Sequence, residues 1–453
     1  MPSLVRVDVE GLLGQFHHDI DFPASWDFVI LYGPNGVGKT KILELIKAVA
    51  AIDLFTLHQI PFDRATLYFE GRIELWIVRV GQLPLPEIMP DSAPVAQYAF
   101  EFSLHEPDSA PVTWTPSSGA TDSRQVAQWI DRHSALTQVG PRQWRNPRNG
   151  RRMSQEETLE FLGASGVYFP NLDDPAPAQL AEFLEDFSVH LIETQRLLTM
   201  ADVDPRSTRE SARASTVEEY SRDVVDKLSM ALAQNSRKSQ ELDRSFPSRL
   251  LRAGELPPTV TDENIRSRYE EQNELRAQLA RISVLDPTPP LPLPTEALES
   301  WQRRVLWTYL DDSEQKLSTF QSLLEKVTLL REIVNSRFIY KELTIDPKNG
   351  FRFVMQDGSE ISPRRLSSGE QHELVLTYEL LFKVRSGSVV FIDEPEISLH
   401  IGWQQSFLND VAKIAELSNF RFVVATHSPQ IIHKWWERAR ALGPEIDPRG
   451  MEI

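Results

Sequence analysis

Cysteine and long apolar runs are missing from this sequence. Its 453 residues include no cysteine, which excludes disulfide bonds and thiolate metal sites. No stretch reaches the roughly 18 apolar residues that a membrane-spanning helix needs. The N-terminal region carries Asp8, Glu10, Asp19 and Asp21 and lacks the basic start and apolar core of a signal peptide. These absences predict a cytoplasmic protein without a membrane segment.

Positive charge is also scarce. Lysine and arginine number 48 against 65 aspartates and glutamates, which gives a formal net charge of −17. Because proteins dedicated to duplex DNA usually present a basic surface to the phosphates, this chain needs a local patch for any contact with nucleic acid. The candidate is Arg142–Arg152 (RQWRNPRNGRR), with five arginines and a tryptophan. This patch is either a solvated loop or a nucleic-acid contact.

Apolar periodicity separates strand-rich segments from helical ones. Residues 66–80 and 97–104 alternate polar and apolar side chains, which predicts antiparallel strands. Helical periodicity begins near Val217, and a long helix is expected over 296–335. A strand is expected at 337–345, and the remainder of the chain alternates helix and strand again.

Together these patterns predict an α/β fold: a mostly parallel sheet with flanking helices and an antiparallel β subdomain, interrupted by a helical insert. The N-terminal lobe is expected at residues 1–200, the insert at 201–336 and the C-terminal lobe at 337–453. Within the first lobe, residues 105–165 are polar and rich in turn-forming residues, which predicts loops around one helix near 123–133. The insert has the character of a short coiled-coil arm that would support oligomerisation.

The most specific motif follows the apolar run 28–31 and precedes a helical pattern. It reads Gly33-Pro34-Asn35-Gly36-Val37-Gly38-Lys39-Thr40. This is the phosphate-binding loop GxxxxGK[ST], in which glycines let backbone N–H groups surround a phosphate at a helix N-terminus. Lys39 is expected to reach the β- and γ-phosphates of ATP, and the Thr40 hydroxyl is expected to ligate Mg²⁺.

Two adjacent carboxylates end another apolar strand, in the segment SVVFIDEP. A buried strand tolerates carboxylates mainly at its C-terminal tip, where ligands bind in open parallel sheets. Asp393 is expected to hold Mg²⁺, directly or through water, and Glu394 to act as the general base that polarises the attacking water.

Two further polar segments lie near these motifs. Leu366-Ser-Ser-Gly-Glu-Gln371 is a small-residue loop before an amphipathic stretch, and Ser367 or Ser368 is a natural helix N-cap. The segment is either a plain capped helix or a nucleotide-contacting signature, and its position before the carboxylate strand favours the signature. His427, at the tip of the apolar run FVVAT, is either a surface histidine or a contact of the γ-phosphate.

The order of these motifs resembles the ABC-ATPase family, in the branch related to RecF, SMC and OLD-type ATPases. The resemblance implies a dimer in which Ser367 and Gly369 of one subunit meet the γ-phosphate bound by the other. Ser368 stands where many relatives have glycine, and Glu370 where transporter-type members often have glutamine. It also implies that Gln195 supplies the glutamine that contacts a water or the Mg²⁺.

The same resemblance suggests partners. The segments SSGEQHELVLTYELLFKV, IDEPEISLHIGWQ and ATHSPQII resemble the ATPase subunits of anti-phage defence systems of the PARIS type and the Septu type. This implies a homo-oligomer, either a dimer or a larger ring, that holds a separate TOPRIM-type or HNH-type nuclease inactive until a phage protein is sensed. The alternative is a DNA-stimulated ATPase of the recombination class, which would use the Arg142–Arg152 patch.

Overall fold

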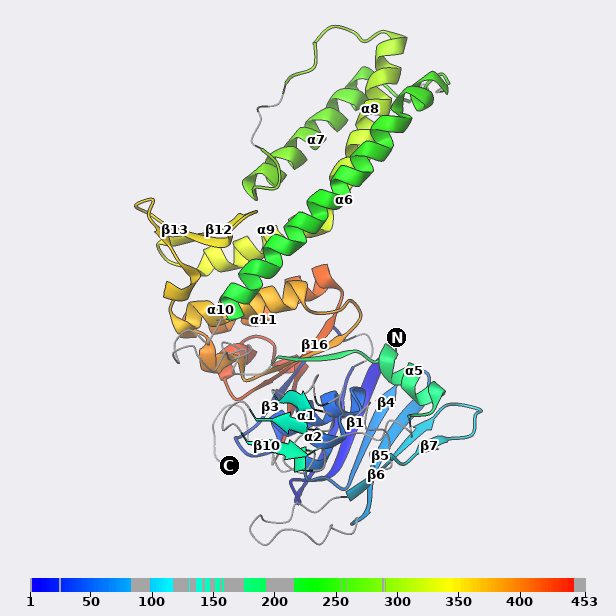
Figure 1. Ribbon diagram of the computed structural model, residues 1–453, viewed down its shortest axis with the longest axis vertical. Helices are drawn as coiled ribbons and strands as arrows, with labels where there is room; N and C mark the ends of the chain where they lie inside the picture. The colour runs from blue at the N-terminus through cyan, green and yellow to red at the C-terminus, as the bar shows by residue number, and fades with distance from the viewer. Residues whose placement is uncertain are drawn as a thin grey trace. The chain divides into compact units, whose positions relative to one another are not determined.

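The computed structural model describes most of the chain in two compact units (Figure 1). The described residues are 2–23, 26–82, 98–116, 130, 136–140, 143–146, 151–154, 157–158, 175–192, 216–252, 254–257, 259–286, 289 and 291–443. The first unit contains the described residues up to Ile192 and from Val384 onwards, and the second contains Thr216 to Lys383. These units do not coincide with the three segments expected from the sequence, since residues 337–383 group with the helices that precede them.

A five-stranded parallel sheet organises the first unit. Its strands, in spatial order, are β11 (Val189–Ile192), β15 (Val389–Asp393), β16 (Arg421–Thr426), β3 (Phe28–Tyr32) and β17 (Ala439–Ala441). The strands β3, β15 and β16 are almost wholly buried, as near-continuous apolar runs predict for a sheet covered on both faces. Because all five strands are parallel, their C-terminal ends meet at one edge, and the predicted phosphate loop and carboxylates follow strands that end there.

A second sheet of six strands belongs to the same unit. Its order is β2 (Phe16–Asp21), β1 (Leu4–Leu12), β4 (Arg64–Phe69), β5 (Ile73–Gln82), β6 (Tyr98–His105) and β7 (Val112–Trp114), with antiparallel neighbours. The expected alternating segments are therefore strands. One apolar cluster contains inward residues of both sheets together with α1 (Lys39–Ala50), for example Val9, Ile42, Leu67 and Phe391.

Smaller elements complete the first unit. They are α2 (Leu54–Gln59), β8 (Thr137–Gly140), β9 (Gln143–Arg145), β10 (Arg152–Ser154), α5 (Ala178–Asp186), the 3₁₀ helices η2 (Pro395–Ser398) and η3 (Trp436–Arg438), α11 (Ile401–Ser418) and α12 (Pro429–Ile432). The strands β8, β9 and β10 form a small antiparallel sheet, although the sequence suggested loops there. The expected helix near 123–133 lies outside the described residues except for Ile130. No described helix is both long enough and apolar enough to cross a membrane.

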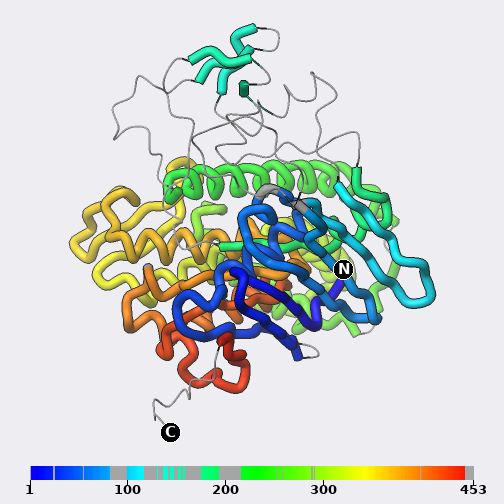
Figure 2. Tube along the Cα trace, turned by 90° about the horizontal axis from the view of Figure 1, so that it is seen from below, coloured from blue at the N-terminus to red at the C-terminus, as the bar shows by residue number. Residues whose placement is uncertain are grey.

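The second unit consists of helices and a small sheet. Its elements are α6 (Thr216–Arg252), α7 (Asp262–Arg281), α8 (Ser300–Ser318), α9 (Gln321–Arg337), β12 (Lys341–Asp346), β13 (Gly350–Met355), β14 (Glu360–Ile361), the 3₁₀ helix η1 (Pro363–Arg365) and α10 (Ser368–Phe382). Figure 2 shows α6 as one long helix. The single helix expected over 296–335 is wrong, since α8 ends before Thr319 and α9 begins at Gln321. The strand expected from residue 337 begins only at Lys341.

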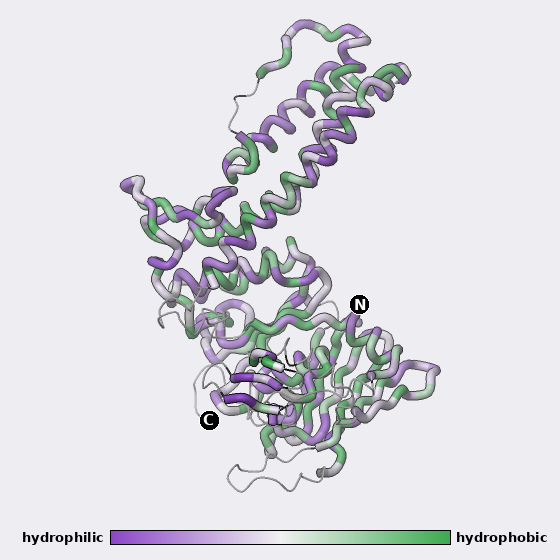
Figure 3. The backbone as a smooth tube through the Cα atoms, viewed as in Figure 1, coloured by the Kyte–Doolittle hydropathy of each residue, from purple (hydrophilic) through white to green (hydrophobic). Residues whose placement is uncertain are grey.

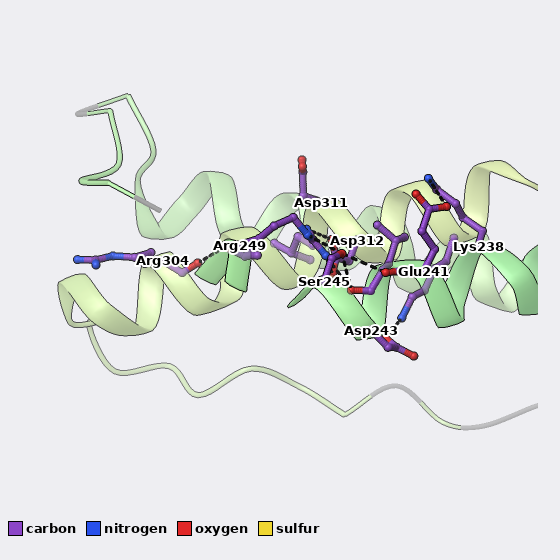
Figure 4. Close-up of polar contacts among 12 residues, drawn as sticks. Lys238, Glu241, Asp243, Ser245, Arg249, Arg304, Asp311 and Asp312 are labelled. Carbon is purple, nitrogen blue, oxygen red and sulfur yellow. Dashed lines mark hydrogen bonds and ion pairs between the residues drawn. The ribbon is translucent and has the colours of Figure 1, made fainter. Parts of the chain in front are cut away.

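Polar contacts between side chains help to pack the three helices α6, α7 and α8, which we call the arm. Figure 3 shows hydrophilic residues along large parts of these helices. The apolar cluster of the arm is small and centres on Ile265 and Leu310. Arg249 of α6 donates to both carboxylate oxygens of Asp312 on α8, with an Nη2–Oδ2 distance of 2.6 Å (Figure 4). Lys316 of α8 donates to Asp243 of α6 at 2.6 Å. The pairing of α6 with α8 therefore depends on ionic contacts as well as apolar ones.

Candidate active site

The phosphate loop connects β3 to α1, as the sequence predicts. Gly33 follows β3, and a Cβ atom on it would lie 2.2 Å from the carbonyl oxygen of Leu442, so only glycine fits. Gly38 precedes α1 with a φ of 95°, a left-handed conformation that costs glycine little. The loop thus delivers its backbone to the N-terminus of α1, where free N–H groups and the helix dipole favour a phosphate.

Lys39 lies across this loop. Its Nζ donates to the carbonyl oxygens of Gly33 at 2.8 Å and Pro34 at 3.1 Å. Burial lowers the pKa of the Lys39 ammonium, while the nearby carboxylates of Glu394 and Asp393 oppose that shift. The buried ring of His18 supports the loop from another side, since its Nε2 lies 2.8 Å from the Val37 carbonyl oxygen. Sequence reasoning gave His18 no role.

The decisive contact joins Thr40 to Asp393. The Thr40 hydroxyl lies 3.1 Å from Oδ1 and 3.0 Å from Oδ2 of Asp393, although 353 positions separate the two residues. Asp393 ends β15 and is only 7% exposed. Burial raises the pKa of its carboxyl to about 6, against the hydrogen bond from Thr40, and the charge of Glu394 adds to the rise.

Hydroxyl and carboxylate oxygens are the donors that Mg²⁺ prefers. The Thr40–Asp393 pair therefore fits a magnesium ion that would also contact the phosphates of a nucleotide held by the loop. Among the described residues, no group of three or more histidine, aspartate or glutamate side chains is arranged to hold a metal ion by itself, so phosphate or water oxygens would complete the coordination. Gln195, the other expected Mg²⁺ contact, lies outside the described residues.

Glu394 follows Asp393 in a left-handed backbone conformation with a φ of 41°. This conformation is uncommon for a residue with a side chain and is typical of functional sites. Its N–H donates to the Ala425 carbonyl oxygen at 2.8 Å, which fixes the turn against β16. The residue lines one small open depression with Asn35, Lys39 and Thr40. A carboxylate at this place can accept a proton from a water beside a bound phosphate.

His427 follows β16, the strand that lies between β15 and β3. Its Nδ1 is 3.9 Å from Glu394 Oε1 and 3.1 Å from Glu396 Oε1. The imidazole is 44% exposed, whereas the Glu396 side chain is 5% exposed. The structure thus brings His427 beside the expected base, and it adds a buried glutamate to which the sequence reasoning assigned no role.

The signature turn belongs to the second unit. Ser367 is the N-cap of α10, and a reciprocal capping box joins it to Glu370. The Glu370 carboxylate also accepts two hydrogen bonds from Lys341, at 2.7 and 2.8 Å. Burial opposes ionisation of Glu370, but its bonds from Lys341 and Ser367 lower its pKa. The turn is a well-capped helix start in which Ser367 and Ser368 are exposed and Gly369 is partly so.

The basic patch is described only in part. Arg145 on β9 lies directly opposite Arg152 on β10, and both are exposed. Trp144, which precedes Arg145 on β9, is fully buried. Arg142 and Arg148 lie outside the described residues.

A comparison with protein families finds one match that covers most of the chain. The family described as "AAA domain, putative AbiEii toxin, Type IV TA system" matches residues 146–433. The matched region contains the signature turn, Asp393, Glu394 and His427, and it begins after the phosphate loop.

Individual relatives are distant. Protein ea59 of Escherichia phage lambda is 26% identical over 135 residues, a match of 29% of this chain and 25% of ea59. The chain therefore matches about a quarter of the length of that curated relative. Among solved structures, an SMC head domain from Pyrococcus furiosus, bound to the C-terminal domain of ScpA, is 14% identical with a TM-score of 0.32, covering 95% of this chain and 91% of that one. The SMC head domain from Thermotoga maritima is 10% identical with a TM-score of 0.30, covering 96% and 92%.

Proposed function

Since this chain belongs to the family of AAA domains that its residues 146–433 match, we propose that it is an ATPase of the ABC type. ATP and Mg²⁺ bind between the phosphate loop and the tip of β15, and a second copy completes the site with Ser367–Gly369. The single observation that carries the proposal is the contact of Thr40 with Asp393 at 3.0–3.1 Å. It unites the two motifs that a phosphoryl-transfer site of this kind requires.

Each residue then has a distinct task. Lys39 exchanges its contacts with Gly33 and Pro34 for the β- and γ-phosphates, Thr40 and Asp393 hold Mg²⁺, and Glu394 accepts a proton from the attacking water. A bound Mg²⁺ supplies charge neutralisation at the phosphates. The exposure of Ser367 and Ser368 supports a contact with a second copy.

Two variants test the ATPase proposal. Lys39→Ala is expected to lose ATP binding, because it removes the cation that faces the phosphates. Glu394→Gln is expected to bind ATP normally and to lose hydrolysis by at least about a hundredfold, the usual contribution of a general base. Nucleotide binding by titration calorimetry and phosphate release would be measured for both. The matched control is Glu416→Gln, which changes an exposed residue of α11. Wild-type turnover in Glu394→Gln would refute the assignment.

The ATPase cycle, we further propose, controls a separate nuclease of TOPRIM or HNH type in a homo-oligomer that responds to a phage protein. The support is the resemblance of the three motif segments to ATPases of PARIS-type and Septu-type systems. Co-expression with the product of a neighbouring nuclease gene is expected to give a complex on size-exclusion chromatography, and Lys39→Ala is expected to change its nuclease activity. Separate elution together with unchanged nuclease activity would count against this role.

One observation favours the DNA-stimulated alternative. Like charges directly opposite on two strands are unfavourable by themselves, so the exposed pair Arg145 and Arg152 suits a polyanion that neutralises both. Duplex DNA is then expected to raise ATP hydrolysis in a salt-sensitive way. Arg145→Glu with Arg152→Glu is expected to remove that stimulation, and an unchanged DNA affinity would contradict the alternative.

A further inference from the structure

Glu396 is a buried carboxylate next to the exposed edge of the candidate site. It lies in η2, three positions after Asp393, and its side chain is 5% exposed. A buried carboxylate is costly unless donors compensate its charge. Its donors therefore indicate what the residue is there to hold.

Among the described residues, the donors to its side chain come from the end of β16 and meet one oxygen. Glu396 Oε1 accepts from the Thr426 hydroxyl at 2.6 Å and from the His427 N–H at 2.8 Å, and it lies 3.1 Å from His427 Nδ1. Within the part of the chain that the structure describes, Oε2 is buried and has no hydrogen-bond partner. The carboxylate is thus aimed at the backbone and the ring of the same histidine.

Neighbouring side chains fix the arrangement. Gln404 of α11 donates its side-chain N–H to the Glu396 carbonyl oxygen at 3.4 Å and accepts from the Ser428 hydroxyl at 2.9 Å. The Ser428 N–H donates to the Thr426 hydroxyl at 3.0 Å. The turn after β15 and the turn after β16 are therefore joined on both sides of His427.

The chemistry of this pair determines which ring nitrogen carries hydrogen. An ionised carboxylate only accepts hydrogen bonds, so Nδ1 of His427 must carry the hydrogen that points at Oε1. The partner of one ring nitrogen decides what the other can do. Nε2, on the opposite side of the ring, is left for a group outside the pair.

We propose that Glu396 is the positioning residue of His427: it accepts the hydrogen bond from Nδ1 and thereby aims Nε2 at the terminal phosphate of the nucleotide, to which Nε2 donates once it also carries a hydrogen. This inference rests on the proposed ATPase function. In this arrangement Glu396 acts only through the histidine. If the carboxylate only stabilised the turn, its hydrogen bonds from the Thr426 hydroxyl and the His427 backbone N–H would be enough. The additional contact with the ring would then have no purpose.

The first test reads the ring directly in the nucleotide-free wild-type protein. Long-range ¹H–¹⁵N spectra of histidine-labelled protein distinguish the two neutral tautomers, and His427→Asn identifies the resonance of interest. The Nδ1–H tautomer is expected in wild type, and Glu396→Gln is expected to shift the population toward Nε2–H. A wild-type ring with hydrogen on Nε2 alone would overturn the proposal, whether or not any variant folds.

The second test compares kinetics. Glu396→Gln is expected to lower kcat for ATP hydrolysis on the order of tenfold, the lower end of the effect of removing a carboxylate that orients a functional histidine, with KM for ATP unchanged. The matched comparison is Thr426→Val, which removes a donor from the same carboxylate oxygen but keeps the carboxylate that faces the ring, and it is expected to lower kcat by less than Glu396→Gln does. In a His427→Ala background, Glu396→Gln is expected to have no further effect.

These outcomes separate the inference from the proposed function. Failure of the wild-type protein to hydrolyse ATP would reject the ATPase proposal itself. Active wild type, inactive Glu394→Gln and an unchanged Glu396→Gln would leave the ATPase intact and reject the role of Glu396. Equal losses in Glu396→Gln with and without His427, or an equal loss in Thr426→Val, would show a structural role and reject positioning.

Discussion

Replacing Asp393 by asparagine is expected to stabilise the nucleotide-free protein. Asp393 is 7% exposed, and burial raises the pKa of its carboxyl to about 6. In the unfolded chain the same carboxyl has a pKa near 4. Between these values the folded protein binds more protons than the unfolded one, so stability falls as the pH rises through this window. Above it, the folded state carries the whole cost of a buried, ionised carboxylate.

The size of the effect follows from the two pKa values. A difference of about two units corresponds to roughly 3 kcal/mol at neutral pH, since each unit is worth about 1.4 kcal/mol. Near pH 4.5 most folded molecules hold the proton, and the cost falls to about 1 kcal/mol. Asparagine keeps an oxygen for the Thr40 hydroxyl and carries no charge. Asp393→Asn should therefore stabilise by up to about 3 kcal/mol near pH 7.5 and by much less near pH 4.5.

Thermal unfolding in EDTA without nucleotide, followed by circular dichroism at both pH values, measures this difference. A gain of this size raises Tm by roughly 5–10 °C when a domain of this size unfolds cooperatively. Asp186→Asn, at the exposed end of α5, is the control and is expected to change stability by less than about 0.5 kcal/mol. An equal gain at both pH values, or none near pH 7.5, would refute the reasoning. The variant should also lose Mg²⁺-dependent ATP binding.

Two further predictions concern the second unit. Ser367→Arg is expected to cost about 1 kcal/mol of stability, because it removes the N-cap of α10. It is also expected to suppress ATP hydrolysis, because a large cation replaces the exposed serine that would meet the partner's nucleotide; normal turnover would show that this turn takes no part in the site. Asp312→Leu is expected to destabilise the pairing of α6 with α8 by about 1–3 kcal/mol, because it leaves Arg249 without its carboxylate partner. This is less than the loss of a fully buried ion pair would cost, since Arg249 is partly exposed. Amide hydrogen exchange in both helices would measure the loss. Asp311→Asn, at an exposed pair with Arg268, should cost less than about 1 kcal/mol, and equal losses in the two variants would contradict the importance of the buried carboxylate.

The local parts of the site were predictable from sequence. A strand, a glycine-rich loop and a helix follow one another from Phe28 to Ala50, so neighbouring residues alone indicate the phosphate loop. Asp393 could be placed nearby because parallel strands end at a common sheet edge. The N-cap at Ser367 was predictable for the same local reason, since a serine followed three residues later by glutamate is a capping box.

Features that depend on distant packing were not predictable. No glycine or proline separates α8 from α9, so the periodic pattern gave no sign of the break at Thr319–Phe320. The short strands β8–β10 lie in a polar region whose composition favours loops. The contact of Glu396 with His427 joins residues 31 positions apart, and in the sequence Glu396 is only one more acidic residue after a conspicuous pair.

Charge balance connects these observations. Lys39 is the cation that faces Asp393, Glu394 and Glu396, and its burial lowers its own pKa while burial raises that of Asp393. Both shifts mean that the nucleotide-free site holds ions the protein solvates poorly. ATP alone would bring further negative charge to three carboxylates, whereas Mg²⁺ beside Thr40 and Asp393 offsets it. The burial of these charged groups is therefore the reason that nucleotide and metal should bind together, and the reason that removing the Asp393 charge should trade function for stability.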